Sequence, residues 1–438
     1  MSRTFYSLRY VNYRLWFVGA LVANVGTWMQ RVAQDWLVLT VLTDNSGTAV
    51  GVVTGLQFLP MLLLSPYAGL VADRLPRRRL LMATQGTLGL LAAGLGALVL
   101  TGAAELWHVY VFASALGVVT AFDNPVRQTF VAELVPGESL PNAVGLNSTS
   151  FNAARLIGPA ASGLLMAAVG PGWAFIINGA SFGATILSLT LMRTGELRPL
   201  ERTQRGKGQV REGVAYVKGR SDIMTILVVV GVVGAFGLNF QMTSAMMASE
   251  EFGKGAGEYG LLGSVMAVGS LSGALLAARR KQPRVRLVLA AAFAFGVTSG
   301  LMALMPTYEL YALMTIPMGM ASLTMMTAAN ATVQMSTEPR MRGRVMSLYM
   351  MIFLGTTPIG APVVGWIGEV LGPRWAVGVG SIAAIVVSVW AALWAARRWD
   401  VELSYQWRVR PHLAMRGPHE RAAERARLDS ARDAPGPA

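Results

Sequence analysis

The chain has 438 residues, of which 53% are hydrophobic and 14% are charged, and it contains no cysteine. Soluble domains carry about 25% charged residues, so this composition excludes an ordinary soluble enzyme and indicates a polytopic membrane protein. The lack of cysteine excludes disulfides, thiol catalysis and cysteine-based metal sites. The three histidines, His108, His412 and His419, are too scattered to predict a metal site.

Twelve stretches are long and apolar enough to cross a bilayer core, which needs about 20 apolar residues per helix. Short, turn-like breaks such as TDNSG and VGPGW separate them. We therefore expect an all-α polytopic membrane protein with both termini on the same side. The predicted spans are residues 15–42, 48–72, 80–101, 106–123, 142–169, 173–192, 222–248, 258–278, 286–305, 309–331, 345–369 and 375–396.

The basic residues lie almost entirely on one side of the predicted bundle. Of the 37 Lys and Arg residues, 33 fall in the termini or in loops on the side of the termini. Lys254 and Arg374 fall on the opposite side, and Arg31 and Arg155 lie within spans. This positive-inside pattern predicts that both termini are cytoplasmic. The net charge of +14 then reflects topology and contact with anionic lipids, and no nucleic-acid partner is expected.

The two halves of the chain resemble each other. When residues 151–175 are laid over residues 353–377 without a gap, eight of 25 positions are identical. The offset corresponds to about six helices, which predicts a parallel repeat of two six-helix bundles. The predicted domains are an N-terminal bundle (1–192), a cytoplasmic linker (193–220), a C-terminal bundle (221–396) and a mostly disordered cytoplasmic tail (397–438).

The loop after the second predicted span reads GLVADRLPRRR, residues 69–79. It resembles the cytoplasmic loop motif of the major facilitator superfamily, G-x-L-A-D-R-x-G-R-R-R, with Val71 and Pro76 as departures. The resemblance implies that the Asp73 carboxylate faces the N-terminal end of helix 11 and that nearby ion pairs close the cytoplasmic side. An ordinary basic loop is the alternative. The matching residues are Gly69, Asp73, Arg74, Arg77, Arg78 and Arg79.

The fifth predicted span carries RLIGPAASG, residues 155–163. It resembles the antiporter signature of the same superfamily, whose core is G-P-x-x-G-G. Gly158, Pro159 and Gly163 match this core, while Ser162 replaces the first glycine of the pair. The resemblance implies a kinked helix 5 that packs on helix 8 and seals the periplasmic side, which favours export. A packing seam with no bearing on direction is the alternative.

A narrower resemblance comes from FDNPVRQTFVAELVP and NAVGLNSTSFNAARLIGP, within residues 122–159, together with GTWMQRVAQDWLV in the first span. These stretches resemble the branch of the superfamily that contains bacterial enterobactin exporters and actinobacterial efflux proteins. The resemblance covers residues 5–396. It implies a secondary active transporter of the bacterial cytoplasmic membrane. Such a protein exports siderophore-like, macrolide-like or other bulky hydrophobic molecules by proton-coupled alternating access.

Polar and charged side chains recur at helical spacing along one face of the first span: Asn24, Trp28, Arg31 and Asp35. The fifth span carries a second such face, made of Ser148, Asn152, Arg155 and Pro159. A charge at a helix centre costs roughly 2.5–3.5 kcal/mol when it faces lipid. Both faces are therefore expected to line a water-filled cavity between the halves.

Arg31 and Asp35 are neighbours on one helical turn and can neutralise each other. One interpretation is that Asp35 exchanges a proton for substrate while Arg31 tunes its proton affinity. The alternative is a static structural pair, which the predicted depth favours, because Asp35 lies roughly 30 Å from Leu15 along the helix. Arg155 has no acidic partner within a turn, so we expect an anionic substrate group or a distant carboxylate such as Asp35 to pair with it.

Three polar but uncharged residues of the second half, Asn239, Gln241 and Asn330, are assigned to the same cavity. Any residue that binds and releases a proton is therefore expected in the first half. Asp123 and Arg127, four residues apart at the cytoplasmic end of the fourth span, are predicted to form gate or interfacial contacts, with a structural role as the alternative.

No G-x-x-x-x-G-K-S/T motif occurs in the chain, which disfavours ATP-driven transport. The expected partners are a small-molecule substrate, protons and the lipid bilayer, with no metal or cofactor, and the chain is expected to be a monomer. Two other functions stay open. An importer or facilitator can use the same scaffold, and a membrane-embedded enzyme would need an intramembrane His, Cys or carboxylate pair, of which Asp35 alone is present.

Overall fold

The computed structural model describes residues 3–198, 209–278, 284–398, 402–406 and 412–416, which are almost entirely helical. The first half begins with the short helix η1 (Arg3–Arg9). Its long helices are α1 (Val11–Trp36), continued by the π-helical turn η2 (Leu37–Leu42), α2 (Gly47–Arg74), α3 (Arg77–Leu100), α4 (Leu106–Leu134), α5 (Leu140–Val169) and α6 (Gly172–Leu191). Two single turns, η3 (Gly137–Ser139) and η4 (Thr194–Glu196), flank α5 and α6.

The second half follows the short helix α7 (Gln209–Lys218). Its helices are α8 (Ser221–Phe236), α9 (Phe240–Met246) with the turn η5 (Met247–Glu251), α10 (Ala256–Ala278), α11 (Val285–Ala303), α12 (Tyr308–Ser336), α13 (Arg342–Gly355), α14 (Thr357–Leu371) and α15 (Pro373–Arg398). Two strands, β1 (Glu402–Gln406) and β2 (His412–Arg416), pair antiparallel in the segment predicted to be disordered. The rest of the tail lies outside the described residues.

The predicted all-helical membrane fold is confirmed. Within the described ranges, eleven helical segments are long and apolar enough to cross a bilayer. The first predicted span is not among them, because its charged and amide side chains, such as Asn24, Gln30 and Arg31, lower the mean hydropathy of α1. A continuous helix nevertheless runs through it, and it is packed on α6, where Thr185 donates a hydrogen bond to the Gly19 carbonyl (3.1 Å).

Three spans differ in detail from their prediction. The helix predicted to end at residue 123 continues through Pro125 to Leu134, because Phe130 and its apolar neighbours bury their side chains against Trp16. The span predicted at 222–248 is broken at Gly237–Asn239. The span predicted at 345–369 is divided at Thr356, beside Pro358, which has no backbone N–H to continue the helical ladder.

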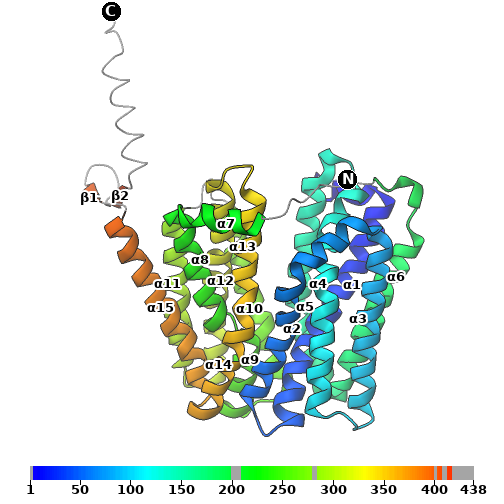
Figure 1. Ribbon diagram of the computed structural model, residues 1–438. Coiled ribbons are helices and arrows are strands. Elements are labelled where there is room, and N and C mark those ends of the chain that lie inside the picture. Colours follow the sequence, from blue (N-terminus) through cyan, green and yellow to red (C-terminus); the bar gives the residue numbers. More distant parts are fainter. Residues whose placement is uncertain (1–2, 199–208, 279–283, 399–401, 407–411, 417–438) are drawn as a thin grey trace, which may run out of the picture.

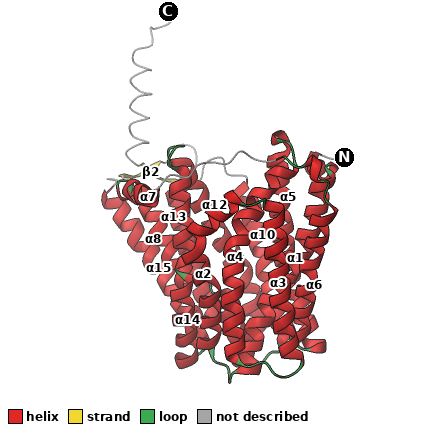
Figure 2. Cartoon of the chain, turned by 45° about the vertical axis from the view of Figure 1, so that its right-hand side comes forward, coloured by secondary structure: helices red, strands yellow, loops and turns green. Residues whose placement is uncertain are grey.

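Helices α1–α6 and α8–α15 form two groups that stand side by side in Figure 1, and Figure 2 shows that nearly all of the described chain is helical. We call the end of the molecule that bears the N-terminus and α7 the terminal face, and the end that bears the loops after η2, α3, α5, η5, α11 and α14 the opposite face. The two groups approach each other toward the opposite face and diverge toward the terminal face (Figure 1).

Two helix pairs join the halves near the opposite face, and glycines make both contacts possible. A Cβ atom on Gly51 of α2 would lie 2.4 Å from the Ala361 carbonyl oxygen of α14. A Cβ atom on Gly260 of α10 would lie 2.4 Å from the Pro159 carbonyl oxygen of α5. Real Cβ atoms do not approach so closely, so these helices pack backbone against backbone, as small residues allow in membranes.

A carboxylate strengthens the same contact region. Glu369 of α14 accepts hydrogen bonds from the Ser46 hydroxyl (2.8 Å) and the Thr48 backbone N–H (3.0 Å). These groups form the N-terminus of α2, where exposed amides favour negative charge. The halves are therefore tied at the opposite face by packing and by a charged hydrogen-bonded contact.

The chain has no cysteine of its own, so introduced cysteines can test the contact between the halves without labelling of native thiols. The Ala167 Cβ of α5 lies 3.9 Å from the Cβ position of Gly257 on α10, within the range of about 3.5–4.5 Å that a disulfide requires. We expect the Ala167→Cys/Gly257→Cys variant to cross-link in membranes under mild oxidation, measured as protection of both thiols from maleimide labelling.

The matched control pair is Gly145→Cys with Leu276→Cys, on the terminal-face halves of the same two helices. A Cβ atom on Gly145 meets no other atom within 4 Å, and Leu276 is exposed. This pair should stay reduced under the same oxidation. Equal cross-linking of the two pairs would contradict the divergence of the halves.

Candidate functional site

Two arginines and a tryptophan gather where α1 meets α5. The guanidinium carbon of Arg31 lies 5.2 Å from the centre of the Trp28 ring, and that of Arg155 lies 5.6 Å from the same ring. Phe151 contacts Trp28 edge to face at 5.8 Å. The structure thus brings the predicted residues Trp28, Arg31 and Arg155 together in one cluster, which is called the Trp28 cluster below.

The two helices can pack this closely because α5 has small residues where it crosses α1. A Cβ atom on Gly158 would lie 2.5 Å from the Trp28 Cβ, so a larger residue would push the helices apart. Ser162, the residue that departs from the antiporter signature, donates a hydrogen bond to the Met29 carbonyl (2.8 Å). The serine therefore fixes α5 on α1 where a glycine could not.

Asp35 lies one turn further along α1 and is buried, with 8% of its surface exposed. It attracts Arg31, but the two do not form an ion pair among the described side chains, so the expected mutual neutralisation is incomplete. Its other neighbour is the hydroxyl group of Tyr259, which belongs to α10 of the second half. That hydroxyl is buried and falls short of hydrogen-bond geometry. Trp36 stacks on the Tyr259 ring at 5.5 Å.

Residues 155–163 also supply the contact of α5 with α10. The carbonyl of Leu156 accepts a hydrogen bond from Ser264 (2.6 Å), and a Cβ atom on Gly163 would lie 2.8 Å from the Ala256 carbonyl oxygen. Pro159 meets Gly260 and Gly263 of α10. One stretch of α5 thus touches α1 on one side and the second half on the other.

The remaining predicted residues of α1 and α5 lie along the helix on the terminal-face side of this cluster. Asn24 is half-buried. Asn152 donates to the Ser148 carbonyl (2.8 Å), and Ser148 is exposed and donates to the Val144 carbonyl (3.1 Å). Ser148 and Asn152 thus donate hydrogen bonds within their own helix and not to the residues of the cluster.

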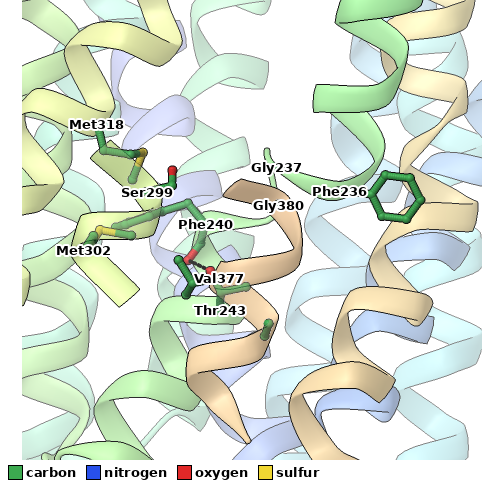
Figure 3. A pocket seen from close by; sticks show the side chains of 10 residues that line it. Phe236, Gly237, Phe240, Thr243, Ser299, Met302, Met318, Val377 and Gly380 are labelled. Carbon is green, nitrogen blue, oxygen red and sulfur yellow. Dashed lines mark hydrogen bonds between the residues drawn. The ribbon is translucent and has the colours of Figure 1, made fainter. Parts of the chain in front are cut away.

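The described hydrogen bonds of the predicted residues of the second half stay within that half, and none joins them to the cluster. Asn239 is buried in the break between α8 and α9 and donates to the Ala235 carbonyl (2.7 Å), while Gln241 is half-buried. Asn330 accepts a hydrogen bond from Gln334 on the same helix. A small pocket opens beside the break (Figure 3). It is lined by Phe236, Gly237, Phe240, Thr243, Ser299, Met302, Met318, Ala376, Val377 and Gly380, so it offers no titratable group.

The arginines of the loop motif contact the first half. Arg77 forms an ion pair with Glu133 at the end of α4, and Arg78 donates to the Leu189 carbonyl of α6 (2.7 Å). Arg74 and Arg79 are exposed. The surroundings of Gly69 and the side chain of Asp73 lie outside the described part of the structure, so the expected contact of Asp73 with helix 11 stays a prediction.

Asp123 is the best-satisfied carboxylate in the described interior. It is 3% exposed and accepts hydrogen bonds from Thr84 (2.7 Å), Gln85 (2.8 Å) and Arg127 (3.0 Å). Thr84 and Gln85 belong to α3, so the carboxylate ties α3 to α4. This arrangement fits the structural alternative that the sequence left open for Asp123 and Arg127.

Two residues at the junction of the halves were not predicted from the sequence, because each contacts a partner in the other half. Tyr259 touches the region of Asp35, and Glu369 reaches the start of α2. No local spacing marks either residue. Within the described ranges, no cluster of three His, Cys, Asp or Glu side chains could hold a metal ion.

Removal of the Asp123 carboxylate should destabilise the protein. Asp123→Ala leaves the Arg127 cation and the buried Gln85 amide without their partner, and breaking a buried ion pair costs about 3–5 kcal/mol. We expect a lower midpoint of thermal unfolding for the purified protein in detergent. Asp44→Ala, which removes an exposed carboxylate from the loop before α2, is the control. A midpoint equal to that of the control would contradict a structural role for Asp123.

The comparisons with known proteins agree with this architecture. The staphyloferrin A transporter of Staphylococcus aureus is 23% identical over 82% of this chain and 90% of its own. The multidrug efflux pump Tap of Mycolicibacterium fortuitum is 25% identical over 81% of this chain and 88% of its own. A bacterial homolog of the human lysosomal transporter Spinster, in an inward-facing and unoccupied conformation, superposes with a TM-score of 0.64 at 16% identity, over 88% of this chain and 96% of that one.

The family comparison is the most extensive. The model of the family described as transmembrane secretion effector matches residues 2–421, which is nearly the whole chain. With the helical architecture and the transporter relatives, this match identifies the class of protein and confirms the resemblance found in the sequence. The chain belongs to the transmembrane secretion effector family of the major facilitator superfamily of transporters.

Proposed function

We propose that this chain exports bulky hydrophobic small molecules across the bacterial cytoplasmic membrane by alternating access, coupled to the inward movement of protons. The N-terminal and C-terminal bundles (1–192 and 221–396) are the two moving bodies, joined by the linker 193–220, and a single chain suffices. This is secondary transport, in which the substrate binds between the halves and each face opens in turn.

The observation that carries the proposal is the position of the Trp28 cluster and Asp35 at the junction of the two halves. Charged groups inside a membrane protein are costly, and they are retained where they face a wet pathway or bind a ligand. The cluster lies beside the α5–α10 contact that closes the opposite face. A substrate bound there would meet the groups that must separate when that face opens.

The distribution of basic residues supports the sidedness. Since 33 of 37 Lys and Arg residues lie on the side of the termini, we assign the terminal face to the cytoplasm. The described conformation, with halves apart at that face, is then the inward-facing one. A hydrophobic compound dissolved in the cytoplasm or inner leaflet could enter it directly.

The relatives support the substrate class and the direction. One is named for a siderophore, staphyloferrin A, and another for multidrug efflux. Both functions move bulky small molecules, so we assign the same broad class to this chain. Packing of α5 on α10 at the proposed periplasmic side fits the export direction implied by the antiporter-like motif.

Asp35 is our candidate for the proton-carrying group. A coupling carboxylate has to change partners during the cycle, and Asp35 lies between Arg31 of its own helix and Tyr259 of the other half. Asp123 is less suited, because three donors already hold it within the first half. Protonation of Asp35 would weaken its attraction to Arg31 as the halves rearrange.

The proposal is tested by compound accumulation in a bacterial strain that lacks its own efflux pumps. A panel of fluorescent hydrophobic compounds is measured with and without the chain, before and after an uncoupler collapses the proton gradient. We expect lower accumulation when the chain is present and a rise to the control level after uncoupling. Higher accumulation in energised cells that express the chain would indicate an importer and contradict export.

Replacement of Asp35 separates coupling from folding. Asp35→Asn keeps the size of the side chain but cannot carry a proton, so energised efflux should fall to the level of cells without the chain while membrane abundance stays unchanged. Asp44→Asn, in an exposed loop, is the control and should pump normally. Wild-type efflux by Asp35→Asn would assign Asp35 a structural role instead.

A further inference from the structure

We propose that the Trp28 cluster is a binding site for the anionic group of the substrate, so that the preferred cargo is an organic anion with an apolar or aromatic body. This inference rests on the proposed export function and names its substrate class. Its basis is the presence of two guanidinium groups in one interior cluster that the described residues leave without an ion-pair partner.

Arg155 lies too deep for its charge to reach water beyond the membrane. It stands near the middle of α5, which runs from Leu140 to Val169. At 1.5 Å per residue, either end of the helix is about 22 Å away. An arginine side chain cannot extend that far, so its cation has to be stabilised where it lies, by water in the pathway between the halves, by the protein or by a ligand.

The protein does not neutralise it there. Among the described residues Arg155 makes no ion pair and no hydrogen bond, and the charge that acts on it is the like charge of Arg31. Asp35 attracts Arg31 alone, and Asp123 is held by Arg127. The Trp28 cluster and Asp35 together therefore hold two cations and one carboxylate. A bound anion would restore the charge balance.

The geometry suits a particular kind of anion. Guanidinium groups bind carboxylate, sulfonate or phosphate oxygens through paired, charge-assisted hydrogen bonds, and both donor sets are still free here. Trp28 and Phe151 form an aromatic surface beside them, with centroids 5.8 Å apart. Phe151 is 48% exposed, so this surface is accessible to a ligand. An acidic head would bind the arginines while an apolar body covers the aromatic rings.

The test compares two fluorescent probes that differ in charge and share one body, 1-pyrenebutyrate and its neutral primary amide. Binding to the purified full-length protein in lipid nanodiscs is measured by fluorescence anisotropy. We expect the anion to bind at least about tenfold more tightly than the amide. Arg155→Gln should remove that preference while leaving amide binding unchanged. Asp35→Asn should strengthen anion binding, since it removes the one opposing charge.

The matched control is Arg193→Gln, which removes an exposed arginine paired with Glu196 at the terminal face and should keep the preference. Equal affinities of the two probes for the wild type, or an unchanged preference in Arg155→Gln, would overturn the anion site. An equal loss of both probes in Arg155→Gln, with normal thermal stability, would assign Arg155 to general packing and also overturn it. Because export is measured separately in cells, a chain that exports the panel without preferring the anion would contradict this inference and leave the proposed function standing.

Discussion

Backbone-to-backbone packing of α5 on α10 and of α2 on α14 is the constraint on which the structure depends. Side chains at Gly51 or Gly260 would collide with carbonyl oxygens of the facing helix. Lipid tails are as apolar as the helix surfaces, so no hydrophobic force drives the halves together, and close van der Waals contact has to do it. The described contacts lie in the halves of α5 and α10 nearer the opposite face, and the two groups of helices diverge toward the terminal face, as Figure 1 shows.

The two halves differ in their use of charge, although they share a repeat. Within its spans the first half carries Arg31, Asp35, Asp123, Arg127 and Arg155. The spans of the second half carry their charges near helix ends, for example Glu369 at the opposite face. The first half is thus equipped to hold and exchange ions, while the second supplies apolar and hydroxyl surfaces such as Tyr259. A substrate between them would meet chemically different walls.

Much of the fold could be predicted, because hydropathy is a local property. The helices begin and end within a few residues of most predicted spans, and the position of Asp35 near the end of α1 followed from helix rise alone. The Trp28 cluster was only half foreseen. Helical spacing put Trp28 and Arg31 on one face. An i, i+4 spacing does not determine which of its neighbours a guanidinium group contacts. We expected Arg31 to pair with Asp35, but its guanidinium group lies over the Trp28 ring. The contact of Asp35 with Tyr259 joins residues more than 200 positions apart, and nothing in either neighbourhood encodes it.

The contact of Glu369 with the start of α2 has an energetic consequence for any motion of the halves. Its oxygen, the Ser46 hydroxyl and the Thr48 amide all lie at the rim of the molecule, in exposed surroundings. When the two halves separate at this rim, water can bind each released group at once, so breaking the contact leaves no polar atom without a hydrogen-bond partner. An exposed contact of this kind therefore positions the two helix ends against each other but adds little to the energy barrier for separating them.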